Sequence, residues 1–457
     1  MRLVEIVSML KQNALLGIGA ALIIAVIVLC AYWMYRKKRP STQRIGRKNA
    51  LVTVLLLCYV CTVVALTLWN RHSYVEGAIN LALFSSYKEA WYAFSARDFQ
   101  YIYFNIAMFI PLGILLPLLH TRFRHIGWTL AAAFVFTALI ESMQYILHVG
   151  IFELDDMMNN VFGALIGFGL VTACLTRKWS MRLLAISPLC VLLVGSIGMY
   201  VYYVQKPFGN LAITAIKEID MKPVHVTTTQ TFSKEQPVGT MYSAPQLTAK
   251  EARQYADKLF AYAAGIQPDE LEVTAYQREA YYTYQGDPAY SIVMNYVDST
   301  YTLSDFSNLE VKRADTDEAT LRSKVKQLHI HIPKKAQFKR LNEGTYEWQV
   351  HQIETDDTLV DGKLKVVYYA DETIKDVENH IVTYKKVADV PLKSEQQAYE
   401  QLCDGKFQTY VTPQRSIQID YVKQSYTLDS KGFYQPVYVF TGKVDGEQTK
   451  ITIPAVQ

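Results

Sequence analysis

Residues 154–167 read Leu154-Asp-Asp-Met-Met-Asn-Asn-Val-Phe-Gly163-Ala-Leu-Ile-Gly167 and open an apolar segment long enough to cross a membrane. The first two turns of this segment hold two carboxylates and two amides, and its next two hold glycines four residues apart. A carboxylate in hydrocarbon costs roughly 2.5–3.5 kcal/mol, so membrane segments keep one only with a partner or a purpose. The stretch predicts a helix that starts as a polar site and continues as a packing surface.

Six segments of the first 204 residues are apolar enough to span a membrane, which takes roughly 20 residues for a ~30 Å hydrocarbon core. These segments are Ala14–Met34, Ala50–Trp69, Tyr101–Leu119, Ile126–Leu147, Met157–Leu175 and Leu183–Val204. We therefore expect an all-α polytopic membrane domain over residues 1–204.

Charge divides the chain at the same place. Residues 1–204 hold 17 Lys and Arg against 8 Asp and Glu, a net of about +9, whereas residues 205–457 hold 29 against 34, about −5. The overall +4 is therefore membrane-flanking basic charge offset by a mildly acidic domain, and it gives no sign of a nucleic-acid-binding protein.

Basic residues predict the direction of the spans. The segments that follow the first, third and fifth spans carry 12 Lys and Arg, against 3 between Arg71 and Arg97 and none between His148 and Asp156. Cytoplasmic loops carry the excess of basic residues. We expect a multi-pass protein of the cell membrane with both termini extracytoplasmic, and the first span is too long and wrongly flanked for a cleaved signal peptide.

Residues 205–457 predict an extracytoplasmic α+β domain built of two or three units, each a helix followed by strands. Helix starts are marked by Thr248 with Glu251, Asp315 with Glu318 and Ser394 with Gln397. Tyr-rich alternating runs follow each helix, and Asp445-Gly446 is a two-residue hairpin turn. Cys403 is the only cysteine of this part, so no disulfide can form within it.

Five polar residues of the third, fourth and fifth spans are predicted to lie at a common depth. At ~1.5 Å per residue, Asn105 lies about 6 Å inside the outer boundary, Gln144 about 4–5 Å, Glu141 about 9 Å and Asn160 about 6 Å, with Asp156 at the boundary itself. Glu141 and Gln144 share one helix face, as do Asp156 and Asn160. These five residues are our candidate binding site.

Small residues and a proline accompany the polar site. Gly163 and Gly167 form a small-xxx-small stripe that lets a neighbouring helix approach closely. Pro111 lies inside the third span, where we expect it to free backbone groups at a bend, and Gly113 follows it. We interpret these four residues as packing positions.

Together these motifs resemble the VanZ-like family of bacterial membrane proteins. The matching motifs lie within residues 101–170, and we expect the VanZ-like core of the membrane domain to extend over residues 101–175. The matching residues are Asn105, Phe109, Pro111 and Gly113, then Glu141 and Gln144, then Asp156, Asn160, Gly163 and Gly167. The chain departs from the family in having no basic residue across Val149-Gly-Ile-Phe-Glu153. The founding member is associated with low-level resistance to teicoplanin, a glycopeptide with a fatty tail, so the resemblance implies a cell-envelope function.

The C-terminal domain loosely resembles PepSY-like extracytoplasmic domains of Gram-positive bacteria. The residues that suggest this are Leu247-Thr-Ala-Lys-Glu-Ala252, Ser394-Glu-Gln-Gln-Ala398-Tyr and Tyr434-Gln-Pro-Val-Tyr438. No Ser/His/Asp arrangement, phosphate loop or pair of carboxylates stands out in this domain, so we interpret it as a binding or regulatory module, with an envelope protein or a wall polymer as its expected partner.

Two functional hypotheses and one structural alternative remain open. The first is a non-enzymatic protein that binds a membrane lipid, a lipid-linked wall precursor or a lipophilic drug at the polar site. The second is an intramembrane enzyme acting on a lipid-linked wall precursor, with Glu141 and Asp156 as an acid/base pair. Alternatively, the amides are interhelical hydrogen-bonding groups and Asp156 caps a helix. No nucleophile, metal set or cofactor motif stands out, so the first hypothesis leads.

Overall fold

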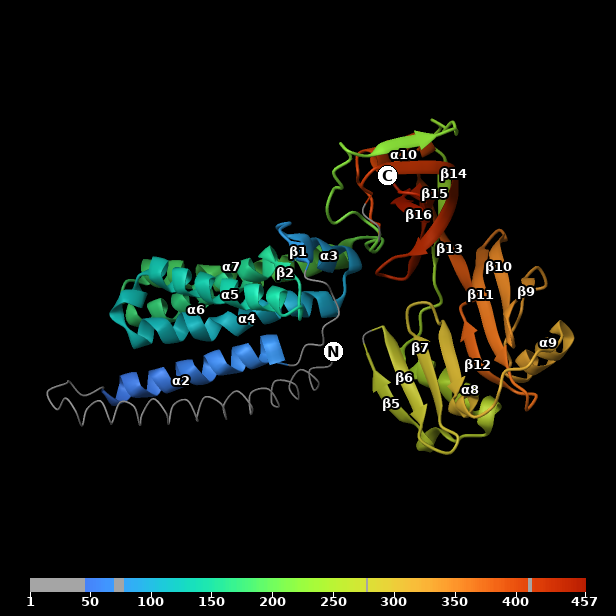
Figure 1. Cartoon of the computed structure of the whole chain (residues 1–457), viewed down its shortest axis with the longest axis horizontal. Helices are drawn as coiled ribbons and strands as arrows, with labels where there is room; N and C mark the ends of the chain where they lie inside the picture. The colour runs from blue at the N-terminus through green and yellow to red at the C-terminus, as the bar shows by residue number, and fades with distance from the viewer. Residues whose placement is uncertain (1–45, 70–77, 277, 410–412) are drawn as a thin grey trace. The chain divides into compact units, whose positions relative to one another are not determined.

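The computed structural model describes residues 46–69, 78–276, 278–409 and 413–457. The chain divides into two compact units, a helical unit that ends at Pro207 and a β-rich unit over Phe208–Gln457 (Figure 1). This division lies three residues after the predicted end of the membrane domain at Val204. The first predicted span, Ala14–Met34, falls outside the described residues.

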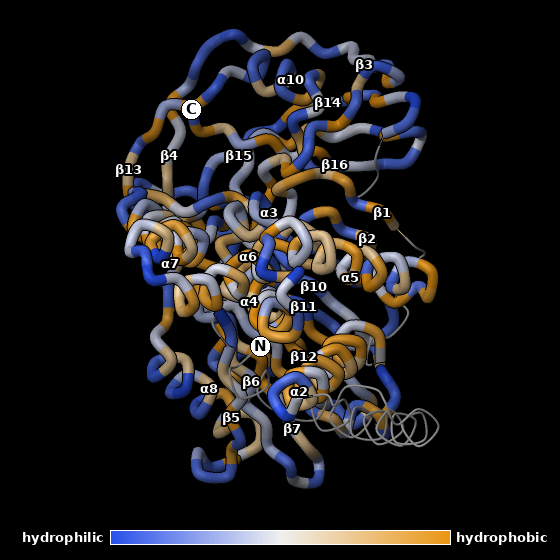
Figure 2. The backbone as a smooth tube through the Cα atoms, turned by 90° about the vertical axis from the view of Figure 1, so that its left-hand side faces the viewer, coloured by the Kyte–Doolittle hydropathy of each residue, from blue (hydrophilic) through white to orange (hydrophobic). Residues whose placement is uncertain are grey.

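Within the described residues, the helical unit has five helices long and apolar enough to cross a membrane. They are α2 (Arg47–Val64, extended by η1, Ala65–Trp69), α4 (Ala96–Leu119), α5 (Ile126–Ile146), α6 (Leu154–Leu175) and α7 (Trp179–Gln205). Hydrophobic (orange) stretches can be seen along α2 and α7 in Figure 2. Each helix coincides with a predicted span to within five residues at either end, so the predicted helical membrane part of the fold is confirmed.

The described residues 78–95, which precede α4, form two short elements. The strand β1 (Ile79–Asn80) pairs in parallel with β2 (Phe152–Glu153), which immediately precedes α6. The helix α3 (Ser85–Ala93) packs against the first half of α4, where Ala90 joins a buried cluster with Ile102. The connection between α2 and α4 is therefore attached to the start of α6 and to the side of α4.

In its described residues, the β-rich unit consists of one fourteen-stranded sheet and three α-helices, α8 (Ala249–Ala264), α9 (Glu318–Gln327) and α10 (Glu395–Cys403). Its strands are β3 (His225–Thr228), β4 (Val238–Ser243), β5 (Glu272–Ala275), β6 (Glu279–Tyr284), β7 (Tyr290–Asn295), β8 (Tyr301–Asp305), β9 (Gln337–Asn342), β10 (Thr345–Glu354), β11 (Thr358–Tyr368), β12 (Ile374–Asn379), β13 (Val382–Pro391), β14 (Ser416–Leu428), β15 (Phe433–Val444) and β16 (Glu447–Pro454). Every pair is antiparallel except β14 with β3, so the predicted α+β class is confirmed.

In the described residues, the sheet covers two large hydrophobic cores, and a smaller cluster around Leu359 and Tyr384 lies apart from both. One lies under α8 and α9 and includes Phe260, Tyr282 and Trp348. The other lies against α10 and includes Phe407 and Phe440. The strands therefore form two lobes that share one continuous sheet.

A glycine marks the passage between the lobes. The strand β11 pairs on one edge with β13 up to Asp361 and with β12 from Leu364 onward. Gly362 lies between these two stretches at φ +117°, and a Cβ there would lie 1.9 Å from the carbonyl oxygen of His380. Only glycine allows both the backbone conformation and the close approach.

Local signals in the sequence predict two of the three helix starts. Thr248 with Glu251 and Ser394 with Gln397 form complete capping boxes at α8 and α10. Asp445 and Gly446, both at positive φ, connect β15 to β16 as the predicted hairpin turn. These predictions depend only on residues a few positions apart, which is why they succeed.

The predicted capping box of Asp315 and Glu318 is wrong. The N-cap of α9 is Asp317, whose carboxylate accepts a hydrogen bond of 2.7 Å from the backbone N–H of Thr320. Asp315 instead accepts from the backbone N–H of Gly344 and pairs with Arg340. Its carboxylate is thus used by a distant loop, which the local pattern does not reveal.

A buried aspartate ties the start of the β-rich unit to the turn between β14 and β15. Asp429 is 2% exposed and accepts hydrogen bonds from the backbone N–H groups of Gly209 (2.6 Å), Lys431 (2.7 Å) and Phe433 (2.9 Å) and from the side-chain amide of Gln435 (2.5 Å). The helix α7 ends at Gln205, so residues 206–208 lie between this helix and Gly209.

Replacing Asp429 by alanine should destabilise the β-rich unit by about 3 kcal/mol or more, because buried donors lose their acceptor. For a unit of this size the melting temperature should fall by roughly 6–12 °C, measured by scanning calorimetry of the purified full-length protein in detergent. The control is Asp404→Ala, since the Asp404 side chain is 58% exposed and its ion pair with Lys406 contributes little. Equal shifts for both variants would contradict this role of Asp429.

Candidate functional site

The start of α6 carries two interleaved pairs of polar residues. Asp155 and Asn159 are four residues apart and share one face, and Asp156 and Asn160 share the next. Asp155, Asn159 and Asn160 are at most 2% exposed, and Asp156 is half-buried. The first two turns of α6 therefore present polar groups toward more than one neighbouring element.

Asp155 holds the start of α3. Its carboxylate accepts hydrogen bonds from the backbone N–H groups of Phe84 (2.6 Å) and Ser86 (2.9 Å), and from the hydroxyls of Ser85 (3.3 Å) and Ser86 (2.7 Å). The first N–H groups of a helix have no partner within the helix, and the N-cap residue Phe84 has no side-chain acceptor to offer. Asp155 takes this role from another helix, and its charge meets the positive end of the α3 dipole.

The second pair reaches α4 and α5. Asp156 accepts a hydrogen bond of 2.5 Å from the side-chain amide of Asn105 in α4. The amide of Asn160 donates to the hydroxyl of Thr137 in α5 at 2.8 Å. Four of these polar side chains thus link three helices within the same end of the bundle.

The two candidate residues of α5 bind backbone groups. Glu141, 2% exposed, accepts a hydrogen bond of 3.2 Å from the backbone N–H of Glu153, at the start of α6. Gln144, 3% exposed, donates to the carbonyl oxygen of Thr67 in η1 at 3.1 Å. The loop that lacks a basic residue therefore supplies a backbone donor to Glu141.

Two atoms of this cluster have no hydrogen-bond partner among the described residues. They are Nδ2 of Asn159 and Oδ1 of Asn160, one donor and one acceptor on consecutive residues of α6. The other amide atom of each residue has a partner. Oδ1 of Asn159 accepts a hydrogen bond from the hydroxyl of Tyr87 in α3, and Nδ2 of Asn160 donates one to the hydroxyl of Thr137. An unpaired buried polar group costs about 1–3 kcal/mol, so these two atoms require an explanation beyond packing.

Comparison with known proteins identifies the region that holds this cluster. Residues 22–175 match the family model described as VanZ/LLP1. This region is VanZ-like. The match extends well before the core predicted at residues 101–175.

Other comparisons add little. No curated protein matches the chain. The C-terminal domain of YpeB from Bacillus megaterium is similar at 10% sequence identity, with coverage of 46% of this chain and 94% of that domain and a TM-score of 0.22. A TM-score this low carries no conclusion about fold or activity.

The glycines of the VanZ-like region lie where α4 and α6 touch. A Cβ on Gly163 would lie 1.9 Å from the carbonyl oxygen of Ile106, and one on Gly167 would lie 2.1 Å from that of Ile110. On the opposing helix, a Cβ on Gly113 would lie 2.0 Å from the carbonyl oxygen of Ala164. The helix α4 is continuous through Pro111. The two backbones are therefore in direct contact along this stripe.

Sequence reasoning missed the residues that face α3. Asp155 and Asn159 have the same spacing as Asp156 and Asn160, so the i, i+4 rule was available as a signal for them. Their partners, Phe84 to Tyr87, lie about 70 positions away in a segment too short and too polar to be read as a span. Thr137 was missed because a threonine in an apolar helix carries no signal of its own.

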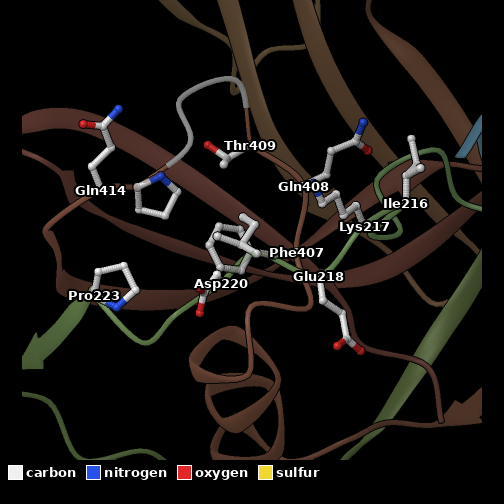
Figure 3. Close-up of a pocket in the computed structure, with 11 residues that line it drawn as sticks. Ile216, Lys217, Glu218, Asp220, Pro223, Phe407, Gln408, Thr409 and Gln414 are labelled. Carbon is white, nitrogen blue, oxygen red and sulfur yellow. The ribbon is translucent and has the colours of Figure 1, made fainter. Parts of the chain in front are cut away.

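The β-rich unit has a hollow of about 620 Å³ (Figure 3). Buried Phe407 lies at its centre, and Glu218, Asp220 and Gln414 surround it. Its lining includes Thr409 and Pro413, which border the residues 410–412 outside the described part, so its wall is described only in part.

The described residues contain no group of three His, Cys, Asp or Glu side chains that could hold a metal ion. His329 and His331, which a strand would place on one face, follow α9 in a turn and an irregular stretch. His329 packs against the ring of Tyr262, with 4.1 Å between ring centroids.

The glycine contact gives a prediction about packing. Gly163→Ala should force α4 and α6 apart at a cost of about 1–3 kcal/mol or more, because backbone cannot yield as a side chain does. We expect lower membrane abundance and a lower melting temperature by fluorescence-detected size-exclusion chromatography. The matched control is Gly195→Ala in α7, where a Cβ would have no heavy atom within 4 Å. Equal behaviour of the two variants would contradict the contact.

The Asp155 contacts give a prediction about local stability. Asp155→Asn replaces a charged acceptor and should raise the local opening of α3 roughly a hundredfold, since hydrogen bonds to charged groups contribute about 1.5–3 kcal/mol each. Hydrogen exchange of residues 84–93 measures this opening. Glu89→Gln, an exposed change within α3 itself, should leave exchange unaltered. Unchanged exchange in Asp155→Asn would show that α3 is held by its contacts with α4.

Proposed function

We propose that the VanZ-like region binds the headgroup of a membrane lipid, of a lipid-linked wall precursor or of a lipophilic drug. The site is the cluster of Asn105, Glu141, Gln144, Asp156 and Asn160, extended by Asp155 and Asn159, in the outer leaflet of the cell membrane. The protein acts in glycopeptide resistance or envelope homeostasis, with both termini and the β-rich unit extracytoplasmic.

The observation that carries the proposal is the pair of amide atoms on Asn159 and Asn160 that no other described residue bonds. A cluster kept only for packing gains nothing from a buried donor and acceptor left unbonded, since each lowers stability. A headgroup that offers both a donor and an acceptor, such as an amide, a phosphate with an amine, or a hydroxyl, satisfies both atoms. Because Asn159 is bonded to Tyr87 of α3, movement of α3 gives access to them.

The positions of aromatic and basic residues support the proposed location of the polar cluster near the outer surface of the membrane. Near the cluster's end of the bundle, Trp91 of α3 stacks on Tyr202 of α7 at 5.9 Å between ring centroids, and Lys206 lies 5.7 Å from the Trp91 ring. Such amphipathic aromatic residues gather at membrane–water interfaces. The basic residues Arg122 and Arg124 follow the opposite end of α4, the end predicted to be cytoplasmic.

The enzymatic alternative gains no specific support. An acid/base pair needs both carboxylates directed at one reacting group. Here Glu141 accepts from the backbone of Glu153, whereas Asp156 accepts from Asn105. We therefore favour binding over catalysis.

Teicoplanin susceptibility of the host strain tests the proposal. A strain that lacks the gene is complemented with wild type, Glu141→Gln, Asp156→Asn or Asn160→Leu, at membrane abundance matched by blot. We expect each variant to lose most of the protection that wild type gives, because each removes a polar contact of the headgroup. Thr129→Val is the control, since Thr129 is equally buried but bonded to Phe123 near the other end of α5.

A thermal shift of the purified protein with added teicoplanin separates direct binding from an indirect effect. A ligand that binds only the folded state raises the melting temperature. A shift in wild type that Asn160→Leu abolishes supports a site at this cluster. Full protection by all three variants would refute the proposal.

A further inference from the structure

The β-rich unit has a second hollow, distinct from that in Figure 3, on the outer face of β8, β12 and β11. Its volume is about 480 Å³, within the range of about 300–1,000 Å³ that is typical of small-molecule sites. The opposite face of the same strands is the hydrophobic core, where Leu303, Val377 and Val366 are at most 2% exposed. The hollow therefore has a rigid floor.

The register of the three strands places its side chains in two rows. In the first row Thr302 lies opposite Glu378, which lies opposite Lys365. In the second row Ser304 lies opposite Asp376, which lies opposite Val367. Because side chains alternate between the faces of a sheet, all six project to the hollow's side.

The carboxylate of Asp376 is held in place by neutral donors. The amide of Asn308 donates to both of its oxygens at 3.2 and 3.1 Å, and the hydroxyl of Tyr369 donates to Oδ2 at 2.7 Å. Burial, followed by the hydrogen bond to Asp376, raises the pKa of Tyr369 to about 12, so this hydroxyl remains a donor at neutral pH. A carboxylate held this way is oriented in advance of any ligand.

The charges of the lining balance. Lys365 pairs with Glu378 at 2.7 Å, and Arg313 and Asp376 supply one further charge of each sign. A phosphate or other anion gains little from such a lining, while a neutral polar ligand meets donors and acceptors in alternation. The hydroxyls of Thr302 and Ser304 can each donate and accept.

The strands also exclude one common mode of peptide binding. The strand β8 is paired on both sides, by β7 and β12, and β12 is paired by β8 and β11. A peptide therefore cannot add itself as a further strand at this place. Ligand recognition here must come from side chains alone.

We propose that this hollow binds a neutral saccharide of one or two rings. The two rows of hydroxyl, carboxylate and ammonium groups bond the sugar hydroxyls. Val367 on the floor and Leu309 at the rim, which is 84% exposed, contact the apolar face of the ring. This site is independent of the function proposed for the VanZ-like region.

Saturation-transfer NMR and calorimetry on the full-length protein in nanodiscs test the proposal, with chitobiose and cellobiose as neutral probes and the dipeptide Ala-Ala as a zwitterionic one. We expect a neutral disaccharide to bind at millimolar concentration or below. Thr302→Val with Ser304→Ala should weaken that binding roughly five- to tenfold, from the loss of one or two hydrogen bonds. Glu378→Gln should weaken it as well.

The matched control is Thr283→Val on β6, which the strand register places on the same sheet face outside the hollow. It should leave the affinity unchanged, and melting temperatures show that all variants fold. The proposal would be overturned if neither sugar bound, or if Ala-Ala bound more tightly than both sugars. It would also be overturned if the Thr302→Val, Ser304→Ala variant bound the sugar with the affinity of wild type.

Discussion

The helical unit depends on one constraint: polar groups removed from water must find partners inside the bundle. Most of the polar groups in the first two turns of α6 meet this constraint, and they do so in two directions. Asp155 takes the free N–H groups at the start of α3, and Asp156 and Asn160 bond to side chains of α4 and α5. In an apolar medium the loss of any such bond leaves a costly unpaired group. The start of α6 therefore determines where the neighbouring elements can lie.

The glycine stripe makes these bonds possible. Asp and Asn have short side chains, so Asn105 can reach Asp156 only if the axes of α4 and α6 lie close together. Glycines at 113, 163 and 167 let each backbone rest on carbonyl groups of the other helix, where a methyl group would lie about 2 Å from a carbonyl oxygen. Lipid tails are as apolar as leucine, so close packing and interhelical hydrogen bonds replace the hydrophobic effect as the source of association. The small residues of α6 allow the close approach of the two helices, and its polar residues form the hydrogen bonds that this approach makes possible.

Much of this arrangement could be predicted from the sequence, and the failures have a common cause. Hydropathy predicts the spans, and short-range spacing predicts two capping boxes and the Asp445-Gly446 turn, because these signals lie within a few residues. The local pattern places Asp315 at a helix start. It gives no sign of the actual partners, Gly344 and Arg340, because they are distant in the chain. Asp155 was overlooked for the same reason, since its donors belong to α3. The two rows of the sugar-sized hollow depend on the register of three strands, which no local pattern specifies.

The hydrogen bonds also distinguish the residues of the cluster that are committed to other elements from those on which the proposed binding rests. Asp155, with four donors around its carboxylate, is largely committed to holding α3, and Gln144 is committed to the backbone of Thr67. Among the described residues, each of the adjacent amides Asn159 and Asn160 has one bonded atom and one unpaired atom. The bonded atom fixes the orientation of the amide, so the unpaired atom is presented at no further cost in side-chain entropy. A ligand that bonded these two atoms would gain the interaction and would also remove the cost of leaving them unpaired, so the proposal places binding here and not at the Asp155 carboxylate.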